Sequence, residues 1–503
     1  MISITTNKLI KLSSMLLTAA MISLAAIPPT IAAPKPKAGA SCTTVGKVQN
    51  VGANKFKCTK SGNKKIWQRV KPKPVATQIS AWGAPAVYDL AKNPELSFNF
   101  TITTNANIDL PKITAVFTAT AADFEIPTQT LELPVTVLEL SRTEITRTYQ
   151  GSLKLTSRDP IGQWRWKIET LTANGSTIAG ILLNSTQEQF AFTRPTFGGA
   201  AAIPINPSPI TTYNSFKNEK FQLYPWEGEN LVILTKTNSL SPSIMGRILY
   251  TLNRSYQSYA AQTNFRPMLF KKHNNKATIA VLGPDEVGCG AACGYLGATG
   301  IEIGQGFFNR LYNGVDKFDQ YDQVLFYELG RNFWDYGGYK FQLSINGAGN
   351  IEASPFWDVS TTGFAVYMRY ATAEINGIPM QPVYNGSHIP WPKFVEDTKS
   401  LVTLQKNSPN SNFANTFQSK KQPAGGPLGV YDFWTSVMMH FAQGKDLAKF
   451  NTDFYAALYR QSTPTSTAGI VANFVAAISS AAGRDVSTEF YSELRFNDAK
   501  ALP

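Results

Sequence analysis

Histidine is scarce in this chain of 503 residues, which has only three: His273, His388 and His440. Scattered single histidines give no pair at metal-ligand spacing, whereas a zinc site needs at least three converging protein ligands. We therefore expect neither zinc nor another cofactor. Beyond the N-terminal 33 residues the chain also lacks an apolar run of about 20 residues, so we expect no further membrane helix.

Three common catalytic signatures are also missing. The sequence has no G-x-S-x-G elbow, no phosphate-binding P-loop and no dinucleotide-binding fingerprint. Their absence argues against the usual serine hydrolases, nucleotide hydrolases and dinucleotide-dependent enzymes. No local spacing of two carboxylates indicates a glycosidase either.

Acidic residues are absent from residues 34–73, which carry eleven lysines and arginines; we call this stretch the basic head. Lys8 and Lys11 supply the rest of the net charge of +13, so the remainder of the chain is neutral. Lysines with one exposed aromatic suit an anionic surface such as a wall polymer, lipid headgroups or nucleic acid, and we expect a cell-wall polymer rather than a specific nucleic acid. A solubilising spacer explains the charge equally well.

Cysteine is limited to four residues in two close pairs, Cys42 with Cys58 and Cys289 with Cys293. An exported protein meets an oxidising environment, so two local disulfides are expected. Polar and apolar residues alternate between Cys42 and Trp67, which indicates a small disulfide-tied hairpin. The head is similar to a short basic module near the N-termini of many exported actinobacterial proteins.

The N-terminus has the pattern of a secretory signal. Two lysines precede an apolar stretch at 15–27, two prolines end that stretch, and small residues follow at 32–33. We assign residues 1–33 to a signal peptide, and we expect the mature protein to be secreted or associated with the cell wall or envelope.

The length predicts several domains, and 43% hydrophobic residues suffice to pack them. After the basic module and linker (34–76), short alternating strands in 77–195 predict an all-β, immunoglobulin-like sandwich that serves as a spacer or adhesive module. In it, Trp164 and Trp166 fit a core better than a carbohydrate platform. A Gly/Pro-rich linker (196–212) leads to an α+β domain (213–503), mainly helical after residue 321.

The segment that carries chemistry is V-L-F-Y-E-L-G-R-N-F-W at 324–334, which has the rhythm of a helix. Tyr327 and Arg331 lie four apart on one face, with Glu328 beside them. The flanks resemble the H-E-x-x-H helix of gluzincin-type zinc metallopeptidases, in which two histidines bind zinc and the glutamate activates water. Here Tyr327 and Arg331 stand at the two histidine positions.

The resemblance covers about residues 213–500 and implies an α+β, zincin-type fold. It makes 300–303 the edge strand that binds substrate backbone, and it places Thr362 where a glutamate would be the third zinc ligand. It also suggests Tyr431, and less so His440, near the oxyanion position, although a helix start and a core residue explain these two as well. Tyrosine ligates zinc poorly and arginine does not.

The substitutions have a physical interpretation. A guanidinium at Arg331 supplies positive charge without metal and can pair with Glu328, Asp358 or Glu352, while Tyr327 donates a hydrogen bond into the same network. An ordinary i, i+3 ion pair on a helix is the simpler alternative.

We therefore expect a metallopeptidase-like protein that has lost its zinc ligands and binds a peptide, or another surface, without catalysis. Two alternatives stay open. One is an active metallopeptidase or other hydrolase with an atypical site, using Glu328 as acid or base. The other is an adhesin or wall-binding protein in which the large domain is a scaffold.

Overall fold

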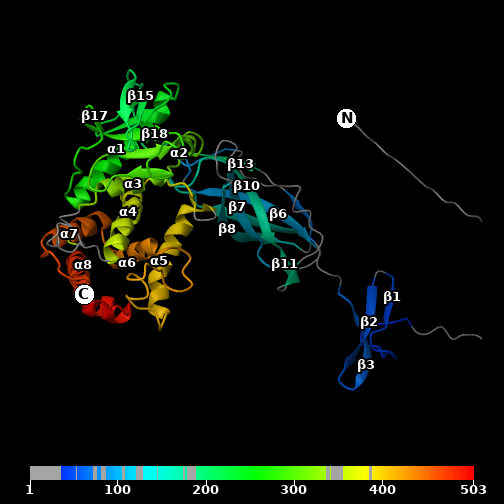
Figure 1. The fold of residues 1–503 in the computed structure, drawn as a ribbon. Helices are drawn as coiled ribbons and strands as arrows, with labels where there is room; N and C mark the ends of the chain where they lie inside the picture. The colour runs from blue at the N-terminus through cyan, green and yellow to red at the C-terminus, as the bar shows by residue number, and fades with distance from the viewer. Residues whose placement is uncertain are drawn as a thin grey trace, which may run out of the picture. The chain divides into compact units, whose positions relative to one another are not determined.

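The computed structural model describes residues 35–52, 54–71, 76–80, 87–93, 95–104, 108–119, 129–143, 146–173, 176–177, 189–335, 340, 355–384 and 388–502. The signal peptide predicted at 1–33 lies outside them. The chain forms two compact units, Met1–Lys73 and Pro74–Pro503. Along the sequence follow a small disulfide-bonded sheet, a nearly closed, barrel-like sheet, and a mixed sheet with a helical C-terminal region (Figure 1). The multidomain α+β prediction is confirmed at this level.

The basic head is a three-stranded antiparallel sheet of β1 (Val48–Val51), β2 (Asn54–Ser61) and β3 (Lys64–Arg69). The predicted disulfide joins Cys42 to Cys58, and its small core contains Phe56, Cys58 and Trp67. The expectation of an exposed aromatic is wrong, because Phe56 and Trp67, the two aromatic residues of the head, are only 8% and 7% exposed. Trp67 lies opposite Cys58 in the strand register, so both side chains share the covered face.

The second part is one path of eight strands in the order β4-β6-β9-β8-β7-β10-β13-β5. Their bounds are β4 Ala76–Ser80, β5 Val87–Asp89, β6 Leu96–Thr104, β7 Lys112–Ala119, β8 Gln129–Arg142, β9 Thr146–Leu153, β10 Gly162–Thr170 and β13 Gln189–Thr193; a separate pair is β11 Thr172–Ala173 with β12 Ser176–Thr177. The long β8 pairs with β7 in its first half and with β9 in its second, which closes the sheet around its core.

The aromatic residues of this sheet form its interior. Trp164 is 1% exposed and Trp166 is 2% exposed, so their prediction as core residues is confirmed. Trp166 stacks on Phe190 with ring centroids 4.7 Å apart. Alternating burial along β6 shows why the period-two pattern predicted these strands.

The third part contains a mixed sheet in the order β14-β15-β16-β18-β20-β19, with β17 beside β18. Its strands are β14 Thr211–Asn214, β15 Lys220–Glu227, β16 Leu231–Thr235, β17 Lys272–His273, β18 Lys276–Leu282, β19 Ala292–Gly294 and β20 Ile301–Gly304; β21 Val383–Tyr384 and β22 His388–Ile389 form a separate hairpin. The central strands β16, β18 and β20 are parallel. All five residues of β16 are buried, as expected of a strand covered on both faces.

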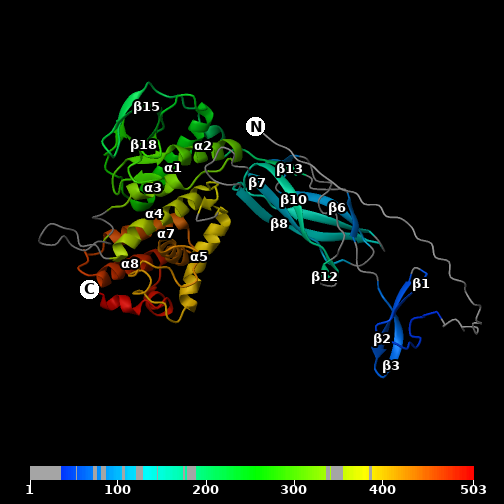
Figure 2. The same cartoon turned by 45° about the vertical axis from the view of Figure 1, so that its right-hand side comes forward.

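Eight α-helices are described: α1 Pro242–Thr263, α2 Gln305–Phe318, α3 Val324–Asn332, α4 Pro355–Asn376, α5 Trp391–Asn407, α6 Val430–Phe441, α7 Leu447–Tyr459 and α8 Thr467–Ala482. Short helices η1 Gly199–Ala201, η2 Glu489–Glu493 and η3 Asn497–Ala501 complete the list. In both views α3 and α4 lie between the mixed sheet and the last helices (Figures 1 and 2). Among the helices of the described ranges, none is long and apolar enough to cross a membrane.

The edge of the mixed sheet differs from the prediction. Strand β20 pairs with β18 on one side and with β19 on the other, so residues 300–303 are not an edge. The edge is β19, which runs antiparallel to β20 and packs against α3. Strand β19 begins inside the Cys289–Cys293 loop, and its three residues are too few to show a period-two pattern.

A buried charge cluster joins the barrel-like sheet to this part. Asp319, at the left-handed C-cap of α2, is fully buried and accepts from both Arg194, just after β13, and Arg247, on α1. The Phe197 amide also donates to it, with a nitrogen–oxygen distance of 2.8 Å. One carboxylate therefore holds three separate segments.

Candidate functional site

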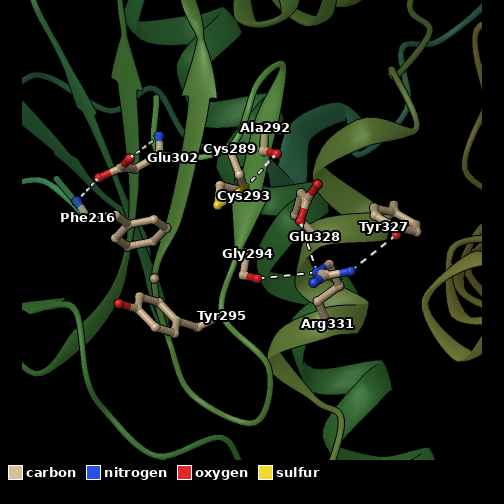
Figure 3. The surroundings of a disulfide bond; sticks show 12 residues. Phe216, Cys289, Ala292, Cys293, Gly294, Tyr295, Glu302, Tyr327, Glu328 and Arg331 are labelled. Atoms are coloured by element: carbon tan, nitrogen blue, oxygen red, sulfur yellow. Dashed lines mark hydrogen bonds and ion pairs between the residues drawn. A yellow bond between two sulfur atoms is a disulfide. The ribbon is translucent and has the colours of Figure 1, made fainter. Parts of the chain in front are cut away.

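Helix α3 presents Glu328 and Arg331 toward the edge strand, and Tyr327 lies on the far side of Arg331 from that strand, as Figure 3 shows. Two glycines permit the close packing around it. A Cβ on Gly294 of β19 would lie 2.8 Å from the Glu328 backbone oxygen, and a Cβ on Gly330 would lie 3.0 Å from the Cα of Ala365 on α4. A larger residue at either position would push α3 away from its neighbours.

Glu328 is 6% exposed, and burial raises its pKa to about 7. The Arg331 guanidinium and the Gly294 amide oppose this shift without cancelling it. The Arg331 Nε lies 3.7 Å from Glu328 Oε2, which is an ion-pair distance but too long for a hydrogen bond. Within the described residues, Oε2 is buried without a hydrogen-bond partner. The expected Glu328–Arg331 pair is therefore present, in its i, i+3 form.

Arg331 also bonds to the edge strand. Its Nε donates to the Gly294 carbonyl over 3.3 Å, and its Nη1 donates to the Tyr327 hydroxyl over 3.4 Å (Figure 3). Tyr295 bonds back to Gly300, so the register turns the backbone groups of Gly294 outward, away from β20. The α3 side chains thus occupy the outer edge of β19 at the position where an added strand would bond.

Two more predicted residues lie on neighbouring helices. The Tyr431 hydroxyl, in the first turn of α6, is 3.5 Å from Asp358 Oδ2 on α4, and Lys420 Nζ is 3.0 Å from the same oxygen. Burial raises the pKa of Tyr431; Asp358 adds to this most among its neighbours, and Tyr327 contributes. The structure therefore brings Tyr431 into the surroundings of Tyr327.

The pairing of Arg331 with Asp358 is wrong, because Asp358 pairs with Lys420 instead. Glu352 lies outside the described residues. Thr362 is half-buried on α4, one helical turn beyond Asp358 and on the same face of that helix.

The histidines have separate surroundings. His440 Nε2 is 2.6 Å from Glu489 Oε1, His273 lies beside Glu227 at 3.6 Å, and burial lowers the pKa of His388 in the β21–β22 hairpin. The structure gives His440 no bond to the α3 residues. Among the residues that the structure describes, no three histidine, cysteine, aspartate or glutamate side chains form a group suited to a metal ion.

The zinc that the gluzincin resemblance implies does not fit the donors at the three ligand positions. Arg331 is a hydrogen-bond donor directed at the Gly294 carbonyl, Tyr327 accepts from that guanidinium, and Thr362 offers only a hydroxyl. None of these groups is a good zinc ligand in this state.

Sequence reasoning missed a buried ion pair behind Tyr327. Arg369 on α4 donates to Gln323 and lies 3.4 Å from Asp432 on α6. Burial lowers the pKa of Arg369, and Asp432, then Tyr327, are among the groups that oppose this. The only available signal was one arginine within the apolar run 364–373.

A second missed residue, Glu302 of β20, fixes the other side of the edge strand. It accepts from the Phe216 amide (2.6 Å), the Gly288 amide (3.0 Å) and the Tyr213 hydroxyl (3.1 Å). These bonds hold the 214–217 turn and the start of the disulfide loop against the sheet. The confirmed Cys289–Cys293 disulfide closes that loop.

Beside β19 lies a hollow of about 260 Å³ lined by Phe216, Lys217, Gly288, Cys293, Gly294 and Tyr295. The Phe216 and Tyr295 rings meet edge to face at 4.5 Å, and Tyr295 meets Phe270 likewise at 4.7 Å. Phe270 is 49% exposed and Tyr295 is 36% exposed. The edge strand is thus bordered by α3 on one side and by accessible aromatic surface on the other.

In comparisons with known proteins, no family model and no curated protein matches this chain.

Proposed function

We propose that this chain is an exported, envelope-associated binding protein whose C-terminal part is a gluzincin-like domain without zinc ligands. The arrangement of α3 against the antiparallel edge strand β19 is the observation that carries the proposal. It is the place where a metallopeptidase would present substrate to the H-E-x-x-H helix, and here it holds Tyr327, Glu328 and Arg331. The barrel-like sheet is then an immunoglobulin-type spacer.

The geometry favours recognition by side chains rather than by strand addition. The strand 300–303 is paired on both sides, and Arg331 already bonds to the outward carbonyl of Gly294 in β19. A peptide could pair with β19 only after displacing that guanidinium. The ligand is therefore held by the polar groups around Tyr327 and by the aromatic hollow, both of which have accessible atoms.

A second function is favoured by the ionisation of Glu328. A carboxyl whose pKa is about 7 can give or take a proton near neutral pH, and Tyr327 and Arg331 beside it can stabilise an anion. This describes a metal-free hydrolase rather than a binding protein. The third possibility is adhesion through the head, with the large domain as a scaffold. It requires neither an ionisable Glu328 nor the anion-stabilising pair of Tyr327 and Arg331.

The first experiment is elemental analysis of the mature protein, before and after incubation with zinc. We expect no stoichiometric metal; one tightly held zinc per chain would overturn the proposal. The second is binding of an extended-peptide library to the wild type and to Tyr431→Phe and Arg331→Ala. Peptides that bind without being cleaved, with affinity altered by these substitutions, support the binding function.

Cleavage of a bound peptide would favour the second function, provided that Glu328→Gln abolishes it. If the folded chain neither binds nor cleaves any peptide, the third possibility remains, in which the large domain is only a scaffold.

A further inference from the structure

The two faces of the head sheet differ in what covers them. Paired residues in an antiparallel sheet share a face, so Phe56, Cys58 and Trp67 point to the disulfide side. The alternate residues of β2, which include Lys55 and Lys57, point to the other side. We call that second side the open face.

The open face carries three lysines and several polar residues, together with Val48 beside Lys57 and Ile66 beside Thr59. The register places Asn50 beside Lys55, Gln68 beside Lys57 and Ser61 beside Lys64. All six of these residues are exposed. Three ammonium groups therefore share one flat surface with amide and hydroxyl groups that can also bond to an anion.

The head contains nothing that neutralises this charge. Residues 34–73 include no aspartate or glutamate. Lys60 and Lys65 lie directly opposite each other on the disulfide side, so they are not part of the open face. The lysines of the open face have no acidic partner within the head, and this favours a polyanion.

We propose that the open face binds a linear phosphate polymer that lacks nucleobases. Lys55 and Lys57 are two residues apart on one strand, about 7 Å, and Lys64 beside Ser61 lies about 14 Å farther along. A row of separated cations fits repeated charges on a chain better than one small anion. Lysine binds phosphate as a point charge, and the neighbouring amides add donors.

The buried aromatic residues argue against binding of single-stranded nucleic acid. Single-stranded nucleic acids are held largely by stacking of bases on exposed aromatic rings. Phe56 and Trp67 are the only aromatic residues in 34–73, and both are buried at 8% and 7% exposed. The open face therefore reads charge and spacing, not bases.

The test measures binding of the full mature chain to inorganic polyphosphate by titration at several salt concentrations. The variant Lys55→Gln/Lys57→Gln/Lys64→Gln is compared with Lys35→Gln/Lys37→Gln/Lys71→Gln, which removes the same charge outside the open face. We expect at least a tenfold greater loss of affinity in the first variant. Its slope of log affinity against log salt should fall by roughly 2, since each phosphate contact contributes about 0.7.

Both variants must retain the Cys42–Cys58 disulfide, checked by mass before and after reduction. Equal weakening in the two variants would overturn the assignment to the open face. Tighter binding to single-stranded DNA, to poly-glutamate or to anionic phospholipid vesicles than to polyphosphate of equal charge would overturn the polymer class.

Discussion

The Arg331 guanidinium donates to the Gly294 backbone carbonyl over 3.3 Å, and this bond ties helix α3 to the outer edge of strand β19. The same guanidinium lies 3.7 Å from the buried Glu328 carboxylate, with which it forms an ion pair. One side chain thus closes a strand edge and balances a charge, which a pair of zinc-binding histidines would not do.

Replacing Arg331 with alanine should destabilise the C-terminal part by about 1–3 kcal/mol at pH 8, because a buried carboxylate loses its partner. Adding Glu328→Gln should restore most of that loss. A double-mutant cycle in thermal or urea unfolding measures the coupling. The matched control is Arg142→Ala, whose partner Glu139 is also three residues away but lies on an exposed surface. Its loss should stay below about 1 kcal/mol; equal losses at both sites would contradict the buried pair.

Glu328→Gln should also change the pH dependence of stability. The folded-state pKa is about 7, above its ordinary value of 4.5. Below pH 4.5 both states are protonated. Between 4.5 and 7 the unfolded chain releases a proton that the folded chain retains, so the free energy of unfolding falls as pH rises. Above pH 7 the buried Glu328 is ionised, and its ionisation lowers the free energy of unfolding by about 3 kcal/mol in full.

Glutamine cannot ionise, so the variant should lose this slope and should exceed the wild type in thermal midpoint at pH 8. Glu489→Gln is the opposite control. Bonds from Arg484, His440 and Lys406 outweigh burial and lower the pKa of Glu489 to about 2, so its stabilisation is present above pH 4.5 and is lost toward pH 2. An unchanged slope in Glu328→Gln would show that this carboxyl is solvated.

Local patterns in the sequence predicted much of the fold. Ile244, Ile248 and Leu252 recur at helical spacing, and they form part of the buried face of α1. On α3, the i, i+4 spacing brought Tyr327 and Arg331 together because both lie on one helix.

Contacts between distant segments were not predictable in this way. The edge strand β19 has only three residues. It forms the edge of the sheet because β20 pairs with it on the side opposite β18. Arg369 and Asp432 are 63 residues apart and meet only through the packing of α4 on α6. The burial of Trp67 depends on its cross-strand position opposite Cys58, which no local pattern gives.

Asp319 should be among the most sensitive charged residues. Asp319→Ala would leave Arg194 and Arg247 buried without their anion, so we expect a loss of about 3–5 kcal/mol in unfolding free energy. The control Asp89→Ala breaks an exposed pair with Lys92 and should cost less than about 1 kcal/mol. Comparable losses in both variants would mean that the Asp319 cluster is solvated.

The basic head should depend on its own disulfide. Its described core has only three buried hydrophobic residues, Phe56, Cys58 and Trp67, which is too little for a domain of this size without a cross-link. The Cys42–Cys58 bond closes a loop with a sequence separation of 16, and losing it should cost about 3 kcal/mol.

In Cys42→Ser/Cys58→Ser, trypsin should therefore cleave rapidly at the head lysines while residues beyond 76 resist. The control Cys289→Ser/Cys293→Ser opens a loop with a separation of only 4 and should leave the head intact. A head that resists trypsin without its disulfide would show that the sheet is stabilised by other contacts.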